Sequence, residues 1–205
     1  MNNERLIKAA RIISGIFNPF LIPFGGFLIL FLFSYLSIMP LEYKLIVLGV
    51  VYCFTILTPM LTIFLFQKLN GWGLKDLSDR KKRFVPYTLT IMAYVFCLMM
   101  MYKLNLPRYM SGIIVATLIA MIVCIIVNLK WKVSEHMTGM GGVVGGLISF
   151  SLIFGYNPVG WLCLSILVAG ALGTSRIVVK QHSLGQVLIG FVIGLVCSIA
   201  GILFI

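Results

Sequence analysis

The sequence predicts an all-α membrane protein, a polytopic bundle of six or seven transmembrane helices. Three observations lead to this prediction. Hydrophobic residues make up 61% of the 205 residues. Only 10% of the residues are charged, against about 25% in soluble domains. The mean hydropathy is +1.11, and the apolar residues fall in long runs separated by short polar stretches. Such a chain is expected to fold within a bilayer.

Seven segments are candidate membrane helices, each of which needs roughly 20 residues to cross a hydrocarbon core of about 30 Å. They are residues 18–38, 44–66, 86–103, 110–129, 138–154, 159–173 and 184–205. The fifth and sixth are short, so we expect them to rely on their polar neighbours or to be shielded from lipid by the other helices. Pro40, Pro107 and Pro158 fall in the predicted turns, where a residue that breaks helices is expected.

The whole chain, residues 1–205, is predicted to form one integral membrane domain. Residues 1–17, MNNERLIKAARIISGIF, form a basic amphipathic segment that runs directly into the first apolar segment. No short apolar core with a small-residue cleavage site opens the chain, so we expect the first membrane helix to be retained. No soluble domain, linker or low-complexity tract is recognisable between the apolar segments.

The positive charges are distributed unevenly. If all seven segments cross, the polar regions 1–17, 67–85, 130–137 and 174–183 share one face. Of the 16 lysines and arginines, only three lie on the other face, namely Lys44, Lys103 and Arg108. Two readings are compatible: the crowded face is cytoplasmic by the positive-inside rule, or an anion site gathers there. The net charge of +11 lies in short loops between apolar segments, so we do not expect a nucleic-acid partner.

Residue types that hold metals are scarce. The chain has two histidines, and its only acidic residues are Glu4, Glu42, Asp76, Asp79 and Glu135. The five cysteines all fall within apolar segments and show no Cys-x-x-Cys spacing. We therefore expect no metal site and no cofactor, and we expect the cysteines to pack as small core or lipid-facing residues.

Three polar clusters lie on the crowded face. The first, GWGLKDLSDRKKRFVPY at 71–87, contains Lys75, Arg80 and Arg83 just before a predicted helix. Arg80 and Arg83 are three residues apart and would point the same way on a helical turn, as required for gripping a phosphate with two guanidinium groups. The alternative is a solvated loop that touches anionic lipid head groups.

The second cluster, WKVSEHMTGMGG at 131–142, places Ser134 and His136 at the start of a glycine-rich helix. Backbone N–H groups and the helix dipole favour an anion there. The alternatives are that Ser134 is only an N-cap and that His136 is only an interfacial residue. Small-xxx-small spacing recurs at 141–145, 142–146 and 190–194, which favours close helix packing or close approach of a substrate.

The third cluster, SRIVVKQHSLGQ at 175–186, holds Ser175, Arg176, His182 and Gln186. If the stretch is helical, Ser175 and His182 share a face, while His182 and Gln186 are four residues apart and can touch. An imidazole oriented by a side chain and close to an arginine is typical of an activated nucleophile.

Together and in this order, the clusters resemble the type 2 phosphatidic acid phosphatase superfamily, integral membrane lipid phosphatases related to vanadium haloperoxidases. That family is marked by Lys-x6-Arg-Pro, then Pro-Ser-Gly-His, then Ser-Arg-x5-His-x3-Asp. The third cluster matches at Ser175, Arg176 and His182, with Gln186 in place of the aspartate. The resemblance covers roughly residues 71–200, and the third motif is the specific one.

The other two motifs match in part. In the second cluster Ser134 and His136 match, whereas Val133 and Glu135 replace proline and glycine. In the first cluster, Lys75 and Arg83 are eight residues apart instead of seven, and Pro86 follows Arg83 by three residues.

The resemblance implies a metal-independent hydrolase that removes phosphate from a lipid phosphate or diphosphate through a phosphohistidine. His182 would attack phosphorus and His136 would protonate the leaving oxygen. The phosphoryl oxygens would be held by Lys75, Arg80, Arg83, Ser134, Ser175 and Arg176. Gln186 would orient His182, although a neutral amide stabilises an imidazolium less than a carboxylate does.

The resemblance also bears on location, since it implies an integral protein of a bacterial inner membrane. In the family's six-helix pattern the first two motifs share a loop, whereas here 86–103 and 110–129 lie between them. An even number of crossings still keeps all three motifs on one face. The charge count indicates the cytoplasmic face, and the habit of the family indicates the outer one. The oligomeric state is left open.

Two other functions compete with the phosphatase. One is a catalytically weak or inactive relative that binds or carries anionic lipids. The other is a transferase that moves a phosphate-bearing group, but the aspartate-rich metal motifs such enzymes need do not occur in this chain.

Overall fold

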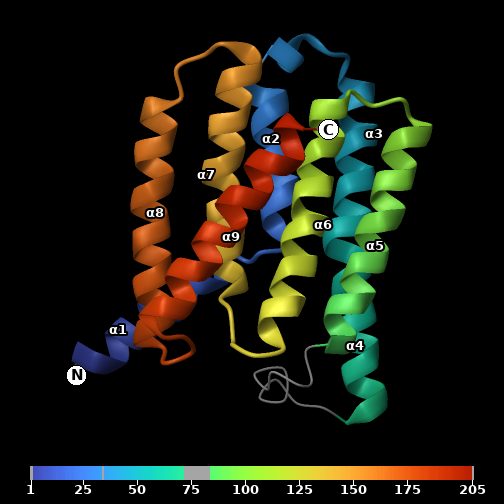
Figure 1. Cartoon of the computed structure of the whole chain (residues 1–205). Coiled ribbons are helices and arrows are strands. Elements are labelled where there is room, and N and C mark those ends of the chain that lie inside the picture. Colours follow the sequence, from blue (N-terminus) through green and yellow to red (C-terminus); the bar gives the residue numbers. More distant parts are fainter. Residues whose placement is uncertain (1, 34, 72–83, 205) are drawn as a thin grey trace.

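The computed structural model of the chain describes residues 2–33, 35–71 and 84–204, and in these ranges the protein is a bundle of helices without strands (Figure 1). The first cluster's Lys75, Arg80 and Arg83 lie outside the described residues. The predicted all-α fold is confirmed.

The helices follow one another along the chain with short connections. They are α1 (Asn2–Ile16), α2 (Leu21–Phe33), the 3-10 turn η1 (Tyr35–Ile38), α3 (Leu41–Tyr52), the π-turn η2 (Cys53–Leu57), α4 (Thr58–Asn70), α5 (Phe84–Lys103), α6 (Arg108–Asn128), α7 (Glu135–Phe154), α8 (Val159–Val178) and α9 (Leu184–Leu203).

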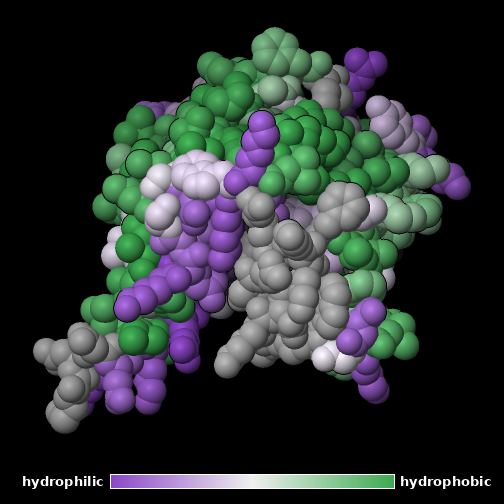
Figure 2. Space-filling view, turned by 60° about the horizontal axis from the view of Figure 1, so that its bottom comes forward, coloured by the Kyte–Doolittle hydropathy of each residue, from purple (hydrophilic) through white to green (hydrophobic). Residues whose placement is uncertain are grey.

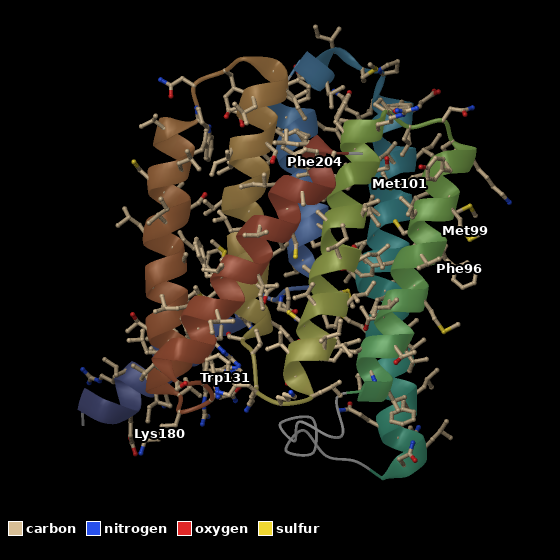
Figure 3. The ribbon with its side chains drawn as sticks, in the orientation of Figure 1. Phe96, Met99, Met101, Trp131, Lys180 and Phe204 are labelled. Carbon is tan, nitrogen blue, oxygen red and sulfur yellow. The ribbon has the colours of Figure 1, made fainter. Side chains whose placement is uncertain are left out.

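Six described helices are long and apolar enough to cross a membrane, because α3, η2 and α4 form one helix over Leu41–Asn70. A seventh span results if α1 and α2 are taken together, although they meet at a bend of 62°. This matches the six or seven predicted spans, and the protein is an integral membrane protein. Phe96 and Met99 of α5 point outward, each 53% exposed, as expected of lipid-facing side chains (Figure 3).

The two segments predicted to be short are longer in the structure. Both α7 and α8 have 20 residues, because α7 begins at Glu135 and α8 continues to Val178, beyond the apolar runs. Tertiary packing supplies most of the stability of a helix, so a helix can extend past its apolar run into polar residues that pack against the bundle. His136 is thereby in the first turn of α7 and Arg176 in the last turn of α8.

Close backbone contact joins α7 to α9, which crosses it obliquely (Figure 1). A Cβ atom on Gly141 would lie 1.9 Å from the Phe191 carbonyl oxygen, and one on Gly194 would lie 1.8 Å from the Thr138 carbonyl oxygen. Glycine is therefore required at both positions, in agreement with the packing role predicted for 141–145 and 190–194. Gly142 differs, since an added Cβ would meet nothing within 4 Å.

Helix α1 docks on the same half of the bundle. It packs along α8, and its Ile13, together with Phe17 just after its last residue, joins the hydrophobic cluster formed by Met137, Met140, Ala169, Leu172 and Val187. The amphipathic N-terminal segment is thus part of the folded bundle rather than a separate tail.

The described parts of the second and third clusters lie at one end of the bundle, together with α1. Trp131 and Lys180 mark this end, and Phe204 lies toward the opposite end (Figure 3). Hydrophilic residues gather on it, whereas the sides of the molecule are mostly hydrophobic (Figure 2). This agrees with the shared face inferred from the number of crossings.

Candidate functional site

The turn between α8 and α9 separates Ser175 from His182. The Lys180 N–H bonds to the Ile177 carbonyl at 2.9 Å, and the Gln181 N–H bonds to the Arg176 carbonyl at 3.1 Å. These two bonds form a Schellman motif, with Lys180 at φ 57° in the left-handed position that glycine usually takes. The hypothesis that Ser175 and His182 share one helical face is therefore wrong, because they belong to different elements. Ser175 turns back to its own helix and donates to the Ala171 carbonyl at 2.8 Å.

His182 and Gln186 are in contact across the start of α9. His182 Nδ1 lies 3.3 Å from Gln186 Oε1, and the same oxygen accepts the Ser183 backbone N–H at 3.2 Å. Because a backbone N–H only donates, the atom facing it is the amide oxygen, and Nδ1 must carry the proton in the bond with His182. In this tautomer Nε2 of His182 holds the basic lone pair.

Gln186 also caps α9. Ser183 is the N-cap, and its hydroxyl accepts from the Gln186 N–H at 3.5 Å, so the two residues form a reciprocal capping box. Gln186 therefore contacts His182 and caps the start of α9 at the same time, and both interactions use Oε1 of its side-chain amide.

Ser134 is the N-cap of α7, but its side chain makes no capping bond. Its hydroxyl is completely buried and has no hydrogen-bond partner among the described residues. The Ser134 N–H reaches the Gln186 carbonyl at 3.4 Å, and a Cβ on Gly190 would lie 2.7 Å from the Ser134 carbonyl oxygen. The starts of α7 and α9 are thus held together, which brings the second and third clusters into contact.

His136 connects α7 to α1. Its Nε2 lies 3.1 Å from the backbone carbonyl oxygen of Ser14. A carbonyl oxygen only accepts, so Nε2 carries the proton. His136 is half-buried between the two helices.

A cavity of about 530 Å³ opens beside this contact. Its lining comes from α1, α7 and the α8–α9 turn, and consists of Arg11, Ser14, Gly15, His136, Arg176, Val179 and Gln181. The volume falls in the range of small-molecule sites, about 300–1,000 Å³.

Arg176 is the most buried cation of this lining. It is 8% exposed, and its Nη2 donates to the Gln181 side-chain oxygen. A guanidinium held in this way has its remaining N–H groups in fixed directions, which suits an oxyanion better than a flexible lysine would.

The structure brings some predicted residues together and leaves others apart. His136 and Arg176 line the cavity, and Ser134 lies beside His136 in the chain. His182 and Gln186 are held at the neighbouring start of α9 but are not among the described lining residues. Sequence reasoning missed Arg11, Ser14 and Gly15 of α1. Their spacing of three and four residues, which puts them on one helical face, was the available signal.

Within the described residues, no group of three or more His, Cys, Asp or Glu side chains is placed to hold a metal ion. Arginine, histidine and hydroxyl groups dominate the polar lining, and these groups favour an anionic ligand. In comparisons with family models, curated proteins and solved structures, nothing matches this chain.

Proposed function

We propose that the protein is a metal-independent membrane phosphatase, a divergent relative of the type 2 phosphatidic acid phosphatases, acting on a lipid phosphate or diphosphate. The observation that carries the proposal is that His136 and Arg176, from two separate motifs, line one cavity. That cavity is also lined by Val179 and Gln181 of the turn that leads to His182, whose Nδ1 contacts Gln186.

The proposed reaction has two steps. Nε2 of His182 attacks phosphorus, the bond from phosphorus to the lipid oxygen breaks, and His136 gives a proton to that oxygen. Water then attacks the phosphohistidine, the P–N bond breaks and inorganic phosphate leaves. His136, now deprotonated, takes up the proton of the attacking water.

Charge on the phosphoryl oxygens is stabilised by cations and hydrogen-bond donors. Arg176 supplies a buried guanidinium, and the buried Ser134 hydroxyl, which has no other partner among the described residues, supplies a donor. Phosphoryl transfer depends mainly on such positioning and charge stabilisation. Lys75, Arg80, Arg83 and Ser175 complete the set implied by the resemblance, although Ser175 bonds to its own helix in this structure.

The test is phosphate release from a panel of lipid phosphates by the purified protein. We expect activity in the presence of EDTA, inhibition by vanadate, and loss of at least about 1,000-fold in His182→Ala, since that substitution removes the nucleophile. Activity that EDTA abolishes and magnesium restores would refute the mechanism.

A second function is favoured by one observation: His182 is outside the described lining of the cavity, and its partner Gln186 is neutral. The cavity would then bind anionic lipids without hydrolysing them. In that case no phosphate is released, and His182→Ala binds the lipid phosphate as tightly as the unmodified protein.

A further inference from the structure

Helix α1 forms one wall of the cavity, and no motif of the resemblance includes it. We infer that α1 is part of a phosphate-binding site, in which Arg11 and Ser14 bind the phosphate group together with Arg176 and His136. The inference rests on the proposed function in one respect: it takes the phosphate group to belong to a lipid head group. Binding itself is measurable without turnover.

The placement of α1 does not depend on a ligand. Ile13 and Phe17 anchor it in the hydrophobic cluster of α7, α8 and α9, and the Ser14 carbonyl accepts from His136 at 3.1 Å. Arg11, Ser14 and Gly15, at spacings of three and four residues, all line the cavity. The bundle therefore holds this face of α1 toward the space beside Arg176.

The Ser14 hydroxyl is a buried donor that a ligand in the cavity could bind. The Ser14 side chain is only 8% exposed, and its hydroxyl has no hydrogen-bond partner among the described residues. A buried hydroxyl without a partner destabilises a fold unless something else satisfies it. A phosphate oxygen in the cavity would accept its proton, next to the ring of His136.

The charged residues that line the cavity indicate which kind of ligand it binds. Two guanidinium groups, Arg11 and Arg176, come from different helices, and no Asp or Glu is among the described residues of the lining. Arginine pairs bind the oxygens of a phosphate through several N–H groups at once. A group with two negative charges fits this lining better than a carboxylate does.

Gly15 provides the space. An added Cβ at Gly15 meets nothing within 4 Å, so a larger side chain there would enter the cavity without displacing backbone. The position allows the cavity to be filled while the fold stays intact.

The first experiment measures the dissociation constants of inorganic phosphate and of dioctanoyl phosphatidic acid for the full chain in detergent, by calorimetry. We expect Arg11→Ala to raise the constant about 10-fold or more, since a charge-assisted bond is lost, and Arg11→Lys to recover part of the affinity. The matched control is Lys8→Ala, which removes one exposed charge from the same helix outside the cavity and should change the constant less than about twofold.

The two ligands distinguish the sources of phosphate. Weakening of both by Arg11→Ala supports recognition of the phosphate group itself. Weakening of the lipid alone supports a lipid head group as the ligand. If Arg11→Ala and Lys8→Ala change both constants equally little, the inference is overturned.

The second experiment uses two other variants, so that the inference can be tested even if Arg11→Ala does not fold. Ser14→Ala should unfold at the same or a higher temperature, because it removes a buried hydroxyl without a partner among the described residues. Its dissociation constant for phosphate should nevertheless rise about 5-fold or more, because a hydrogen bond to the ligand is lost. Gly15→Leu should abolish binding, whereas Gly170→Leu, an exposed position of α8 with equal open space, should not. Unchanged binding in both Ser14→Ala and Gly15→Leu overturns the inference.

Failure of this inference differs from failure of the proposed function. If the protein releases phosphate and neither Arg11→Ala nor Gly15→Leu changes the rate, the proposed phosphatase function holds, but α1 is not part of the site. If phosphate binding depends on Arg11 but no phosphate is released, the binding site is supported and the phosphatase function is refuted.

Discussion

The imidazole of His136 donates a hydrogen bond to the backbone carbonyl of Ser14, with 3.1 Å between Nε2 and the oxygen, across 122 residues of sequence. This contact ties the amphipathic N-terminal helix to the glycine-rich helix α7. It also places the candidate acid of the proposed reaction at the wall of the cavity. To protonate a leaving group, His136 would therefore have to give up its hydrogen bond to the Ser14 carbonyl and bond to the substrate instead.

Replacing His136 by phenylalanine should loosen α1. The substitution removes one hydrogen bond, worth about 1 kcal/mol, so amide hydrogen exchange in residues 2–16 should accelerate roughly fivefold. The amides of α5, which is not among the elements packed on α1, serve as the internal control. Unchanged exchange in α1 would mean that Ile13 and Phe17 alone hold the helix.

Gln186 should affect both catalysis and stability. Gln186→Leu removes the bonds to His182 and to the Ser183 N–H, and we expect a loss of turnover on the order of 10- to 1000-fold. Gln186→Asp adds a negative charge toward His182 and should raise turnover if the chemical step limits the rate. Phosphate release under saturating substrate measures both.

The matched control for Gln186 is Ser183→Ala. It removes the other half of the capping box and should cost about 1 kcal/mol of stability, with turnover within about threefold of the original. If Gln186→Leu lowers stability but leaves turnover within that same range, Gln186 is only a helix cap.

Ser134→Ala should separate a ligand contact from a structural one. Because the hydroxyl is buried without a described partner and does not cap its helix, its removal should leave the melting temperature equal or higher. Turnover should fall about 10-fold if the hydroxyl donates to phosphate. Ser149→Ala on the same helix is the control: it breaks a bond to the Gly145 carbonyl, so it should lower stability and leave turnover unchanged.

The α7–α9 contact should tolerate almost no added volume. Gly194→Ala would set a methyl group 1.8 Å from the Thr138 carbonyl oxygen and should destabilise the protein by about 2 kcal/mol or more. Gly142→Ala meets nothing within 4 Å and should be neutral or stabilising by up to about 1 kcal/mol. Thermal unfolding of both variants in one detergent makes the comparison, and equal melting temperatures would contradict the packing described for this interface.

Composition and spacing by themselves determined the class of fold and nearly all of its helices. Apolar run length decides which segments enter a bilayer, and prolines mark the turns after residues 38, 103 and 154. The contact between His182 and Gln186 was also within reach of the sequence, because the two residues are only four positions apart, although His182 precedes the N-cap of α9 and the contact forms at the capped helix start. These features are local, so residues close along the chain are sufficient to specify them.

Only the tertiary structure decided which polar groups share the cavity. The end of α8 at Val178 depends on the left-handed conformation of Lys180, which no propensity of lysine predicts. Arg11 and Ser14 reach the site because α1 packs against α8, and the buried Ser134 hydroxyl makes no capping bond although Ser134 is the N-cap of α7. Each of these arrangements is set by packing between segments far apart in the chain, and the residues of either segment alone do not contain it.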